Sequence, residues 1–260
     1  MRPSHAFPLL AAAWLAACQT VPYTGRSHMM LVSQGEESQL GEQSYKETLT
    51  KATLSTDSAK IQLIRKVGMR IAKAADRPDF RWEFNLIQDD KTINAWCLPG
   101  GKVAFYTGIL PITRDEDGIA VVMGHEIAHA LARHGAERMS QGMVAGVGEK
   151  ALNVLLATQT SVPPGVYQQA YGLGMNLGVL LPFSRKHESE ADEIGLILMA
   201  KAGYDPVHAL AFWKRMAAAT GGAGENSPLA QFIRTHPTDG KRQEQIAAWL
   251  PDIKAKYYKP

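Results

Sequence analysis

The sequence has little cysteine, no strong charge of either sign and no long apolar run beyond its N-terminus. Its 260 residues include two cysteines, and 28 lysines and arginines against 25 aspartates and glutamates leave a net charge of +3. Two cysteines exclude a disulfide-rich scaffold. The small charge surplus, without any run of five like charges, argues against a phosphate-binding surface, so we expect no nucleic-acid partner. The most apolar later stretch, 172–183, is shorter than the roughly 20 residues of a membrane span, and we expect a core or lid segment there.

The N-terminal residues have the pattern of a secretory signal. Arg2 is followed by an apolar run over 7–15, which is too short for a permanent membrane helix. Residues 15–18, Leu-Ala-Ala-Cys, resemble the bacterial lipobox, in which the signal is removed and Cys18 becomes the acylated first residue. Gln19, in place of Asp, resembles the outer-membrane sorting pattern of Gram-negative lipoproteins. The alternative is an ordinary signal peptide in which Cys18 is incidental.

The remaining sequence has the apolar content of a globular protein, 45%, and regular hydrophobic patterns. Residues 21–41 are polar and resemble a tether that leads into the first helix. The patterns predict helices over 36–51, 61–71, 118–139, 184–202, 206–219 and 239–249, and strands over 80–86 and 102–106. Residues 142–178 are rich in glycine and predict two loose helices around a turn, and 221–224 predict a flexible loop.

The predicted helix over 118–139 contains His125-Glu126-Ile127-Ala128-His129. Two histidines four residues apart lie on one helix face, so that both imidazoles can bind one metal ion. Glu126 follows the first histidine and can lie over the metal without binding it. There it would accept a proton from a metal-bound water molecule.

A catalytic zinc ion has three protein ligands and one open position, so a third ligand must come from elsewhere. His134 lies nine residues after His125 and faces the wrong way for this role, and we interpret it as a helix-end residue. Glu188 and Asp192 lie one turn apart on a second predicted helix. This spacing resembles that of gluzincins, which implies that Glu188 binds the metal and that Asp192 binds the outer nitrogen of a ligating histidine. Glu190 points to another side of that helix. The alternative is that this acidic run only favours a helix N-terminus.

The motif His125-Glu126-x-x-His129 followed by Glu188-x-x-x-Asp192 resembles the HtpX and CAAX-prenyl-endopeptidase family of zinc gluzincins, in particular its soluble periplasmic lipoprotein branch. HtpX itself carries membrane spans that this sequence lacks. The resemblance covers nearly the whole mature chain, because further segments are similar to that branch. These are Thr24-Gly25-Arg26, Asn94-Ala95, Pro99-Gly100-Gly101, residues 117–134, Thr235-His236-Pro237 and Arg242.

One departure from the family is Trp96-Cys97, where members more often have an aliphatic or Phe-Ala pair. Cys97 as a fourth zinc ligand would close the position that the catalytic water needs. We therefore expect a buried and inert thiol.

The resemblance implies an α+β fold, mainly helical, of the gluzincin type, with a small antiparallel sheet beside the active-site helix. We divide the chain into a lipoprotein signal peptide (1–17), an acylated tether with the first helix (18–50) and a zinc metallopeptidase domain (51–260). The resemblance also implies that residues 94–106 form an edge strand that binds an extended peptide by strand addition. The residues expected to bind substrate are Asn94, Ala95, Pro99, Gly100 and Gly101. The alternative is that the glycine pair merely makes a hairpin turn.

The resemblance further suggests roles for His236 and Arg242. His236 follows a loose loop and precedes a proline, so we expect it on an exposed and movable connection. In the family branch this resembles a His-Pro element whose imidazole can occupy the fourth zinc position and exclude the catalytic water. His236 could instead assist the transition state, or be a solvated histidine beside a helix start. Arg242 could stabilise a developing oxyanion or pair with a carboxylate near the metal.

Together these features predict a zinc-dependent endopeptidase with one Zn²⁺ per chain, bound by His125, His129 and Glu188, and with Glu126 as general base. We expect it on the periplasmic face of the outer membrane of a Gram-negative bacterium, anchored by a lipid on Cys18. Its expected partners are unfolded or misassembled envelope proteins and the outer-membrane assembly machinery. The competing hypothesis is a chaperone or assembly factor with little proteolysis, and the intact Glu126 favours the enzyme. A structural zinc protein fits least well, because three ligands leave the site open.

Overall fold

The computed structural model describes residues 18–144, 183–220, 229, 232, 235, 236 and 241–259. The predicted signal peptide, most of the glycine-rich segment over 142–178, the apolar stretch before Phe183 and the loop over 221–224 lie outside these residues. No helix within the described ranges is long and apolar enough to cross a membrane.

The described elements are short strands and longer helices. In chain order they are β1 (Cys18–Thr20), β2 (Ser27–Met29), α2 (Gln34–Lys51), α3 (Ser58–Ala75), β3 (Glu83–Ile87), β4 (Ala95–Leu98), β5 (Lys102–Tyr106), the 3₁₀ turn η1 (Thr107–Ile109), α4 (Leu110–Thr113), α5 (Glu116–Leu131), α8 (Arg185–Lys201), α9 (His208–Thr220) and α11 (Arg242–Tyr257). Residues 134–144 are also helical. The mainly helical α+β fold is thereby confirmed.

Side-chain caps explain where several of these helices begin. Ser33 and Glu36 form a reciprocal capping box at the start of α2, and Asp57, Asp115 and Ser184 each accept a backbone hydrogen bond at the start of α3, α5 and α8. The last helix differs from the prediction, because α11 continues through Pro251 to Tyr257 instead of ending at Trp249. Its continuation buries Ile253 in the main core.

The larger sheet is mixed rather than purely antiparallel. Its strand order is β3-β5-β4, with β3 and β5 parallel and β4 and β5 antiparallel. The expectation that all of 94–106 forms one edge strand is therefore wrong, because β5 is the central strand and β4 alone is an edge. Gly100 and Gly101, both with φ near +84°, make the tight turn between them.

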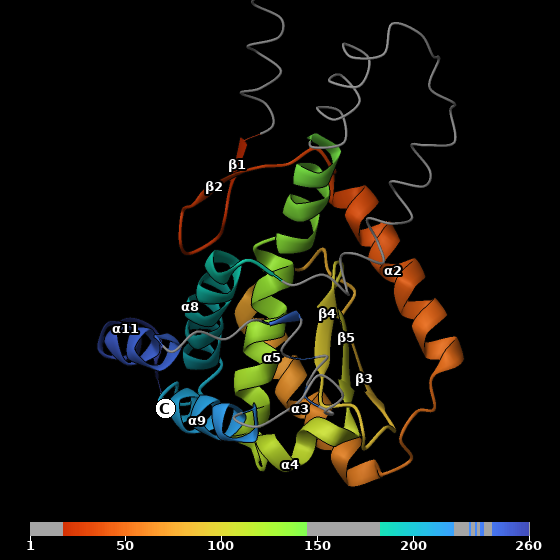
Figure 1. Ribbon diagram of the computed structural model, residues 1–260, viewed down its shortest axis with the longest axis vertical. Coiled ribbons are helices and arrows are strands. Elements are labelled where there is room, and N and C mark those ends of the chain that lie inside the picture. The colour runs from red at the N-terminus through yellow and green to blue at the C-terminus, as the bar shows by residue number, and fades with distance from the viewer. Residues whose placement is uncertain are drawn as a thin grey trace, which may run out of the picture.

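The sheet lies between α2 on one face and α3 with α5 on the other, and α8 and α11 follow as outer layers (Figure 1). Every residue of α5 from Gly118 to Leu131 is buried. α5 and α8 pack closely against each other, and a Cβ added to Gly124 would lie 2.8 Å from the carbonyl oxygen of Gly195. This close approach brings the histidines of α5 within reach of the carboxylates of α8.

The long helix predicted over 118–139 is interrupted. α5 ends at Leu131, Arg133 adopts a left-handed conformation (φ 56°), and the chain becomes helical again at His134. The buried Arg133 guanidinium donates to Glu37 (2.6 Å) and to the carbonyl oxygen of Val32 (2.8 Å). These tertiary hydrogen bonds stabilise a break that helical periodicity does not indicate, and the break redirects His134.

Residues 18–29 form a docked β-hairpin rather than a free tether. β1 and β2 pair antiparallel, and Val21 lies in the main core. After the hairpin, Met30 and Val32 pack with Ala136 in a second apolar cluster. The hairpin is thereby fixed against the helix that follows α5.

Candidate metal centre and active site

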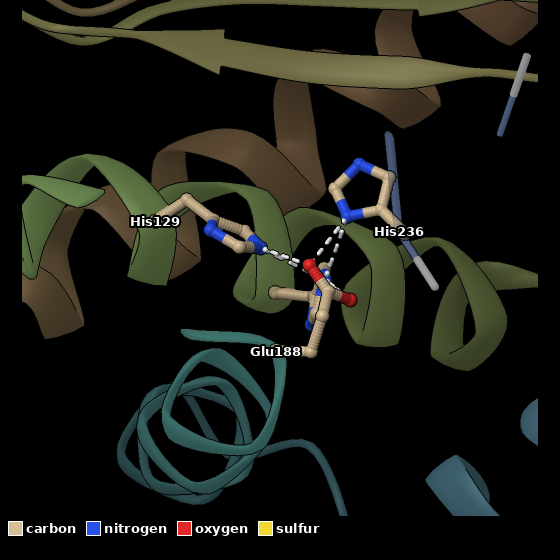
Figure 2. Close-up of side chains that lie close together, drawn as sticks. His129, Glu188 and His236 are labelled. Atoms are coloured by element: carbon tan, nitrogen blue, oxygen red, sulfur yellow. Dashed lines mark hydrogen bonds and ion pairs between the residues drawn. The ribbon is translucent and has the colours of Figure 1, made fainter. Parts of the chain in front are cut away.

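Four buried side chains from three parts of the chain converge at the centre of the molecule. α5 contributes His125 and His129, α8 contributes Glu188 and the segment before α11 contributes His236, with one ligand atom from each lying within 4.8 Å of all the others. Figure 2 shows the imidazoles of His129 and His236 directed at the Glu188 carboxylate.

The spacing of these atoms fits one tetrahedral metal ion. Four ligand atoms about 2.0–2.1 Å from a zinc ion lie roughly 3.3–3.4 Å from one another. The observed separations are 3.1 Å between the Nε2 atoms of His125 and His129, and 3.3 Å between Nε2 of His125 and Nδ1 of His236. Oε1 of Glu188 lies 3.3 Å from Nε2 of His129 and 3.1 Å from Nδ1 of His236. Imidazole nitrogens and one carboxylate oxygen are also the donor set of catalytic zinc.

The position of His236 differs from the expected exposed connection, because its side chain is buried. The rings of Phe232 and Phe183 pack against it, and its backbone N–H donates to the carbonyl oxygen of Phe232 (2.8 Å). The imidazole also faces Glu126, with 3.6 Å between Nε2 and Oε1. It therefore lies between the Glu188 carboxylate and Glu126.

Glu126 is buried beside the cluster and is not one of its four members. Its Oε1 accepts no hydrogen bond from the described residues. Burial raises the pKa of its carboxyl group. A carboxylate with a raised pKa beside a metal site suits proton transfer.

The outer nitrogen of His125 is held as the sequence predicts. Nδ1 of His125 lies 3.0 Å from Oδ1 of Asp192, which in turn accepts a 2.6 Å hydrogen bond from Arg242. The Arg242 guanidinium stacks on the ring of Trp213, with 3.3 Å between its carbon and the ring centroid. Its Nε and Nη1 atoms make no hydrogen bond to the described residues. Of the two roles considered for Arg242, the geometry has it paired with a carboxylate near the metal site.

The outer nitrogen of His129 has a partner that the sequence analysis missed. Nδ1 of His129 lies 2.9 Å from Nδ1 of His134, and Nε2 of His134 lies 3.0 Å from Oε2 of Glu190. His134 is fully buried at the start of the helix that follows the break, and Glu190, which is not a member of the metal cluster, binds it from α8. The backbone break at Arg133 produces this arrangement, and the hydrophobic pattern of the sequence does not indicate that break.

Burial and the neighbouring charges shift the pKa values of the cluster in different directions. Burial lowers the pKa of His129 well below 6.5 and that of His134 to about 4, which keeps both imidazoles neutral. Burial also opposes the charged form of His125, but the hydrogen bonds that it donates to Asp192 and Glu188 raise its pKa to about 9. Burial alone would raise the pKa of Glu188, whereas the nearby histidines lower it well below 4.5. The surroundings therefore favour a protonated His125 beside an ionised Glu188.

The residues expected to bind substrate lie at the β4 edge and the turn after it. Asn94 is buried, and its carbonyl oxygen accepts from the Tyr106 backbone N–H (3.1 Å). Gly101 packs against Trp82, where a Cβ would lie 2.8 Å from the ring, so the glycine pair has a structural reason of its own. Beside this edge is an apolar pocket, lined in part by Leu40, Cys97, Pro99, His129, Met139 and Phe183. Cys97 is half-buried and is not a member of the metal cluster.

Comparison with known proteins shows which family has this site. The profile of Peptidase family M48 matches residues 58–250. Mitochondrial metalloendopeptidase OMA1 of Schizosaccharomyces pombe is 38% identical over 239 residues, which cover 91% of this chain and 67% of that protein. The β-barrel assembly-enhancing protease of Escherichia coli is 28% identical over 237 residues, which cover 90% of this chain and 47% of that protein. Human metalloendopeptidase OMA1 is 28% identical over 254 residues, which cover 94% of this chain and 48% of that protein.

The chain spans about half the length of the bacterial and human relatives. These relatives are OMA1 and β-barrel assembly-enhancing proteases rather than HtpX or CAAX prenyl endopeptidases, so the predicted resemblance holds at the level of the family. M48 peptidases use zinc, and the His125, His129, Glu188 and His236 cluster fits that ion. The chain belongs to Peptidase family M48 and is a zinc metalloendopeptidase.

Proposed function

We propose that this peptidase cleaves unfolded or misassembled proteins of the bacterial envelope, on the periplasmic face of the outer membrane. The observation that carries the peptidase activity is the buried cluster of His125, His129 and Glu188 with Glu126 beside it. The envelope location is supported by the lipobox-like residues 15–18 and by the similarity to the β-barrel assembly-enhancing protease. The OMA1 relatives carry mitochondrial names, so they do not favour this location.

In this proposal His125, His129 and Glu188 hold the zinc ion, and Glu126 is the general base. Bound zinc supplies Lewis-acid activation of a water molecule and of the scissile carbonyl. Glu126 accepts the proton of the attacking water and delivers it to the departing amide nitrogen. Asp192 fixes the His125 ring through its Nδ1 atom, and Arg242 holds Asp192. The Nη1 atom of Arg242 lies 3.5 Å from Oε2 of Glu188 and makes no hydrogen bond to the described residues, and in this proposal it donates to the developing oxyanion.

An extended substrate would bind along the free edge of β4. A strand edge offers unpaired backbone donors and acceptors, which recognise a peptide with little regard to its sequence. The apolar pocket beside Pro99 and Cys97 would accept an apolar side chain of that peptide. Unfolded proteins expose both features, so they are the substrate class that fits this surface best.

His236 acts as a switch in this scheme. Its ring lies between Glu188 and Glu126, with Nδ1 3.1 Å from Oε1 of Glu188 and Nε2 3.6 Å from Oε1 of Glu126. In that position it occupies the space that the catalytic water needs. Proteolysis then requires the segment that carries His236 to move.

The same closed arrangement favours a second candidate function, a chaperone or assembly factor with little proteolysis. A site closed by His236 could still bind extended polypeptides along β4 without cutting them. The printed name of the E. coli relative, assembly-enhancing, is in line with such a role for that protein.

A trapping experiment tests the proposed function. We would express Glu126→Gln in cells, crosslink, and identify the polypeptides retained in the membrane and periplasmic fractions. Glu193→Gln is a matched control, because Glu193 is a half-buried glutamate of α8 outside the metal cluster. Enrichment of envelope proteins by Glu126→Gln, and their accumulation when the peptidase is absent, is expected. Equal retention by both variants, or enrichment of proteins from another compartment, would refute the proposal.

A further inference from the structure

The N-terminal hairpin ends in a charged contact with the centre of the molecule. Arg26, on the turn between β1 and β2, donates from Nε to Oε2 of Glu190 (2.7 Å) and from both terminal nitrogens to Glu137 (2.9 and 2.6 Å). Thr24 donates its hydroxyl to the other oxygen of Glu190 (2.5 Å). Both carboxylates are buried. Without the guanidinium, Glu137 and Glu190 would lose the permanent positive charge that these two buried carboxylates share.

Gly25 makes this double contact feasible. Its φ of +67° is a left-handed conformation, and no heavy atom lies within 4 Å of an added Cβ. The glycine is therefore needed for its backbone conformation and not for close packing. The tight turn lets both Thr24 and Arg26 reach Glu190. The turn at Thr24-Gly25-Arg26 thus places the Thr24 hydroxyl and the Arg26 guanidinium against the same carboxylate, that of Glu190.

Glu190 continues into the metal cluster through two imidazoles. Nε2 of His129 faces the cluster, so its Nδ1 carries the proton and donates to Nδ1 of His134. His134 must then carry its own proton on Nε2, from which it donates to Glu190. One set of tautomers satisfies the whole chain of hydrogen bonds. The carboxylate of Glu190 therefore fixes the ring orientation and the tautomer of His129.

The two histidines of α5 are supported in parallel ways. Asp192 of α8 holds His125, and Arg242, from the C-terminal helix α11, binds Asp192. Glu190, also of α8, holds His129 through His134, and Arg26, from the N-terminal hairpin, binds Glu190. In each case a carboxylate of α8 is held by an arginine from outside α5 and α8.

We propose that Thr24 and Arg26 of the N-terminal hairpin are positioning residues of the zinc site, acting on His129 through Glu190 and His134. This inference rests on the proposed role of His129 as a zinc ligand. Partners of this kind typically contribute 10–100-fold to metal affinity. The hairpin also begins at Cys18, so the residue expected to carry the lipid anchor lies on the same small element as this support.

The test is the zinc affinity of purified full-length variants, measured by competition with a chromophoric chelator. His134→Phe keeps the ring that stacks on His187 (4.4 Å between centroids) but removes both nitrogens. We expect the Kd for zinc to rise on the order of 10–100-fold in His134→Phe and about tenfold in Arg26→Ala, with partial recovery in Arg26→Lys. The visible spectrum of the Co²⁺-substituted protein should shift in the same order, because it reports the ligand geometry.

Tyr23→Phe is the matched control. The Tyr23 hydroxyl accepts a hydrogen bond from Lys201 (2.8 Å), which ties the same hairpin to the same helix at a point away from the metal cluster. Its Kd for zinc and its Co²⁺ spectrum should equal those of the wild type. An equal rise in Kd in Tyr23→Phe and Arg26→Ala would overturn the inference, because docking of the hairpin alone would then explain the effect.

Unchanged affinity and spectrum in both His134→Phe and Arg26→Ala would also overturn it. If circular dichroism shows that Arg26→Ala does not fold, Thr24→Val decides, since it keeps the shape of the side chain and removes the hydroxyl that donates to Glu190 and accepts from the Arg26 backbone N–H. His129→Ala distinguishes the assignment of His129 as a zinc ligand from the positioning role of the hairpin. Wild-type affinity in His129→Ala would refute the ligand assignment, whereas lost affinity there with normal affinity in the hairpin variants would refute the inference alone.

Discussion

The contact between α5 and α8 at Gly124 gives a prediction whose size follows from the structure. In Gly124→Ala the new Cβ would lie 2.8 Å from the carbonyl oxygen of Gly195, and ordinary contacts begin near 3.4 Å. The helices must therefore separate by about 0.6 Å, more than the roughly 0.5 Å within which a catalytic constellation has to be held. Overpacking of this kind typically costs about 1–3 kcal/mol. We expect a lower free energy of unfolding in urea and, because Glu188 moves with α8, weaker zinc binding.

Gly142→Ala is the control for this prediction. Gly142 is exposed in the helix over 134–144, and an added Cβ there meets no heavy atom within 4 Å. Alanine is a better helix former than glycine, so the free energy of unfolding should stay the same or rise by about 0.5–1 kcal/mol. Unchanged stability and zinc affinity in Gly124→Ala would show that the helices can separate freely. The argument that their close approach positions the site would then be wrong.

Three further outcomes are expected. His236→Ala should retain zinc on the other three ligands and raise basal hydrolysis of casein, and a lower turnover with normal zinc content would instead mean that His236 assists the transition state. Cys18→Ser should move the protein from the membrane fraction to the soluble periplasm on cell fractionation, and unchanged membrane association would contradict lipid anchoring there. Burial, and then the charge of Glu126, raise the pKa of Cys97 well above 9.0, so iodoacetamide at pH 8 should alkylate the native thiol much more slowly than the unfolded one. Equal rates would show that Cys97 is a reactive thiol.

The sequence predicted those features that depend on local patterns. Apolar residues at helical spacing indicated α3 and α5, and the spacing of His125 and His129 together with Glu188 and Asp192 indicated the cluster. Helix geometry alone makes i and i+4 side chains neighbours, so each pair could be predicted without the tertiary structure. That the two pairs meet at one site was expected from the family resemblance.

Features that depend on partners distant in the sequence were missed. The break at Arg133 is stabilised by Glu37 and the backbone of Val32, about a hundred residues earlier, so no helical pattern could indicate it. For the same reason the hydrogen bonds that link His129 to His134 and Glu190 were missed, since the break redirects His134. His236 was expected to be exposed because it follows a loose loop and precedes a proline, but the ring of Phe232, four residues earlier, and that of the distant Phe183 pack against it and bury it.

The parallel pairing of β3 with β5 was missed as well. Two strands that flank a third strand in the sequence suggest a simple antiparallel meander. The burial of all but the last residue of β5 marks it as the central strand, and that burial is a property of the assembled layers.

The most direct test of the proposed mechanism is a paired measurement on Glu126→Gln. Zinc content would be determined by atomic absorption, and hydrolysis of an unfolded casein substrate would be followed on the same preparation. Because Glu126 is the proposed base and not a ligand, we predict about one zinc per chain, as in the wild type, and no detectable cleavage. Retained hydrolysis would contradict the role of Glu126 as the base, and loss of zinc would contradict the assignment of the ligands.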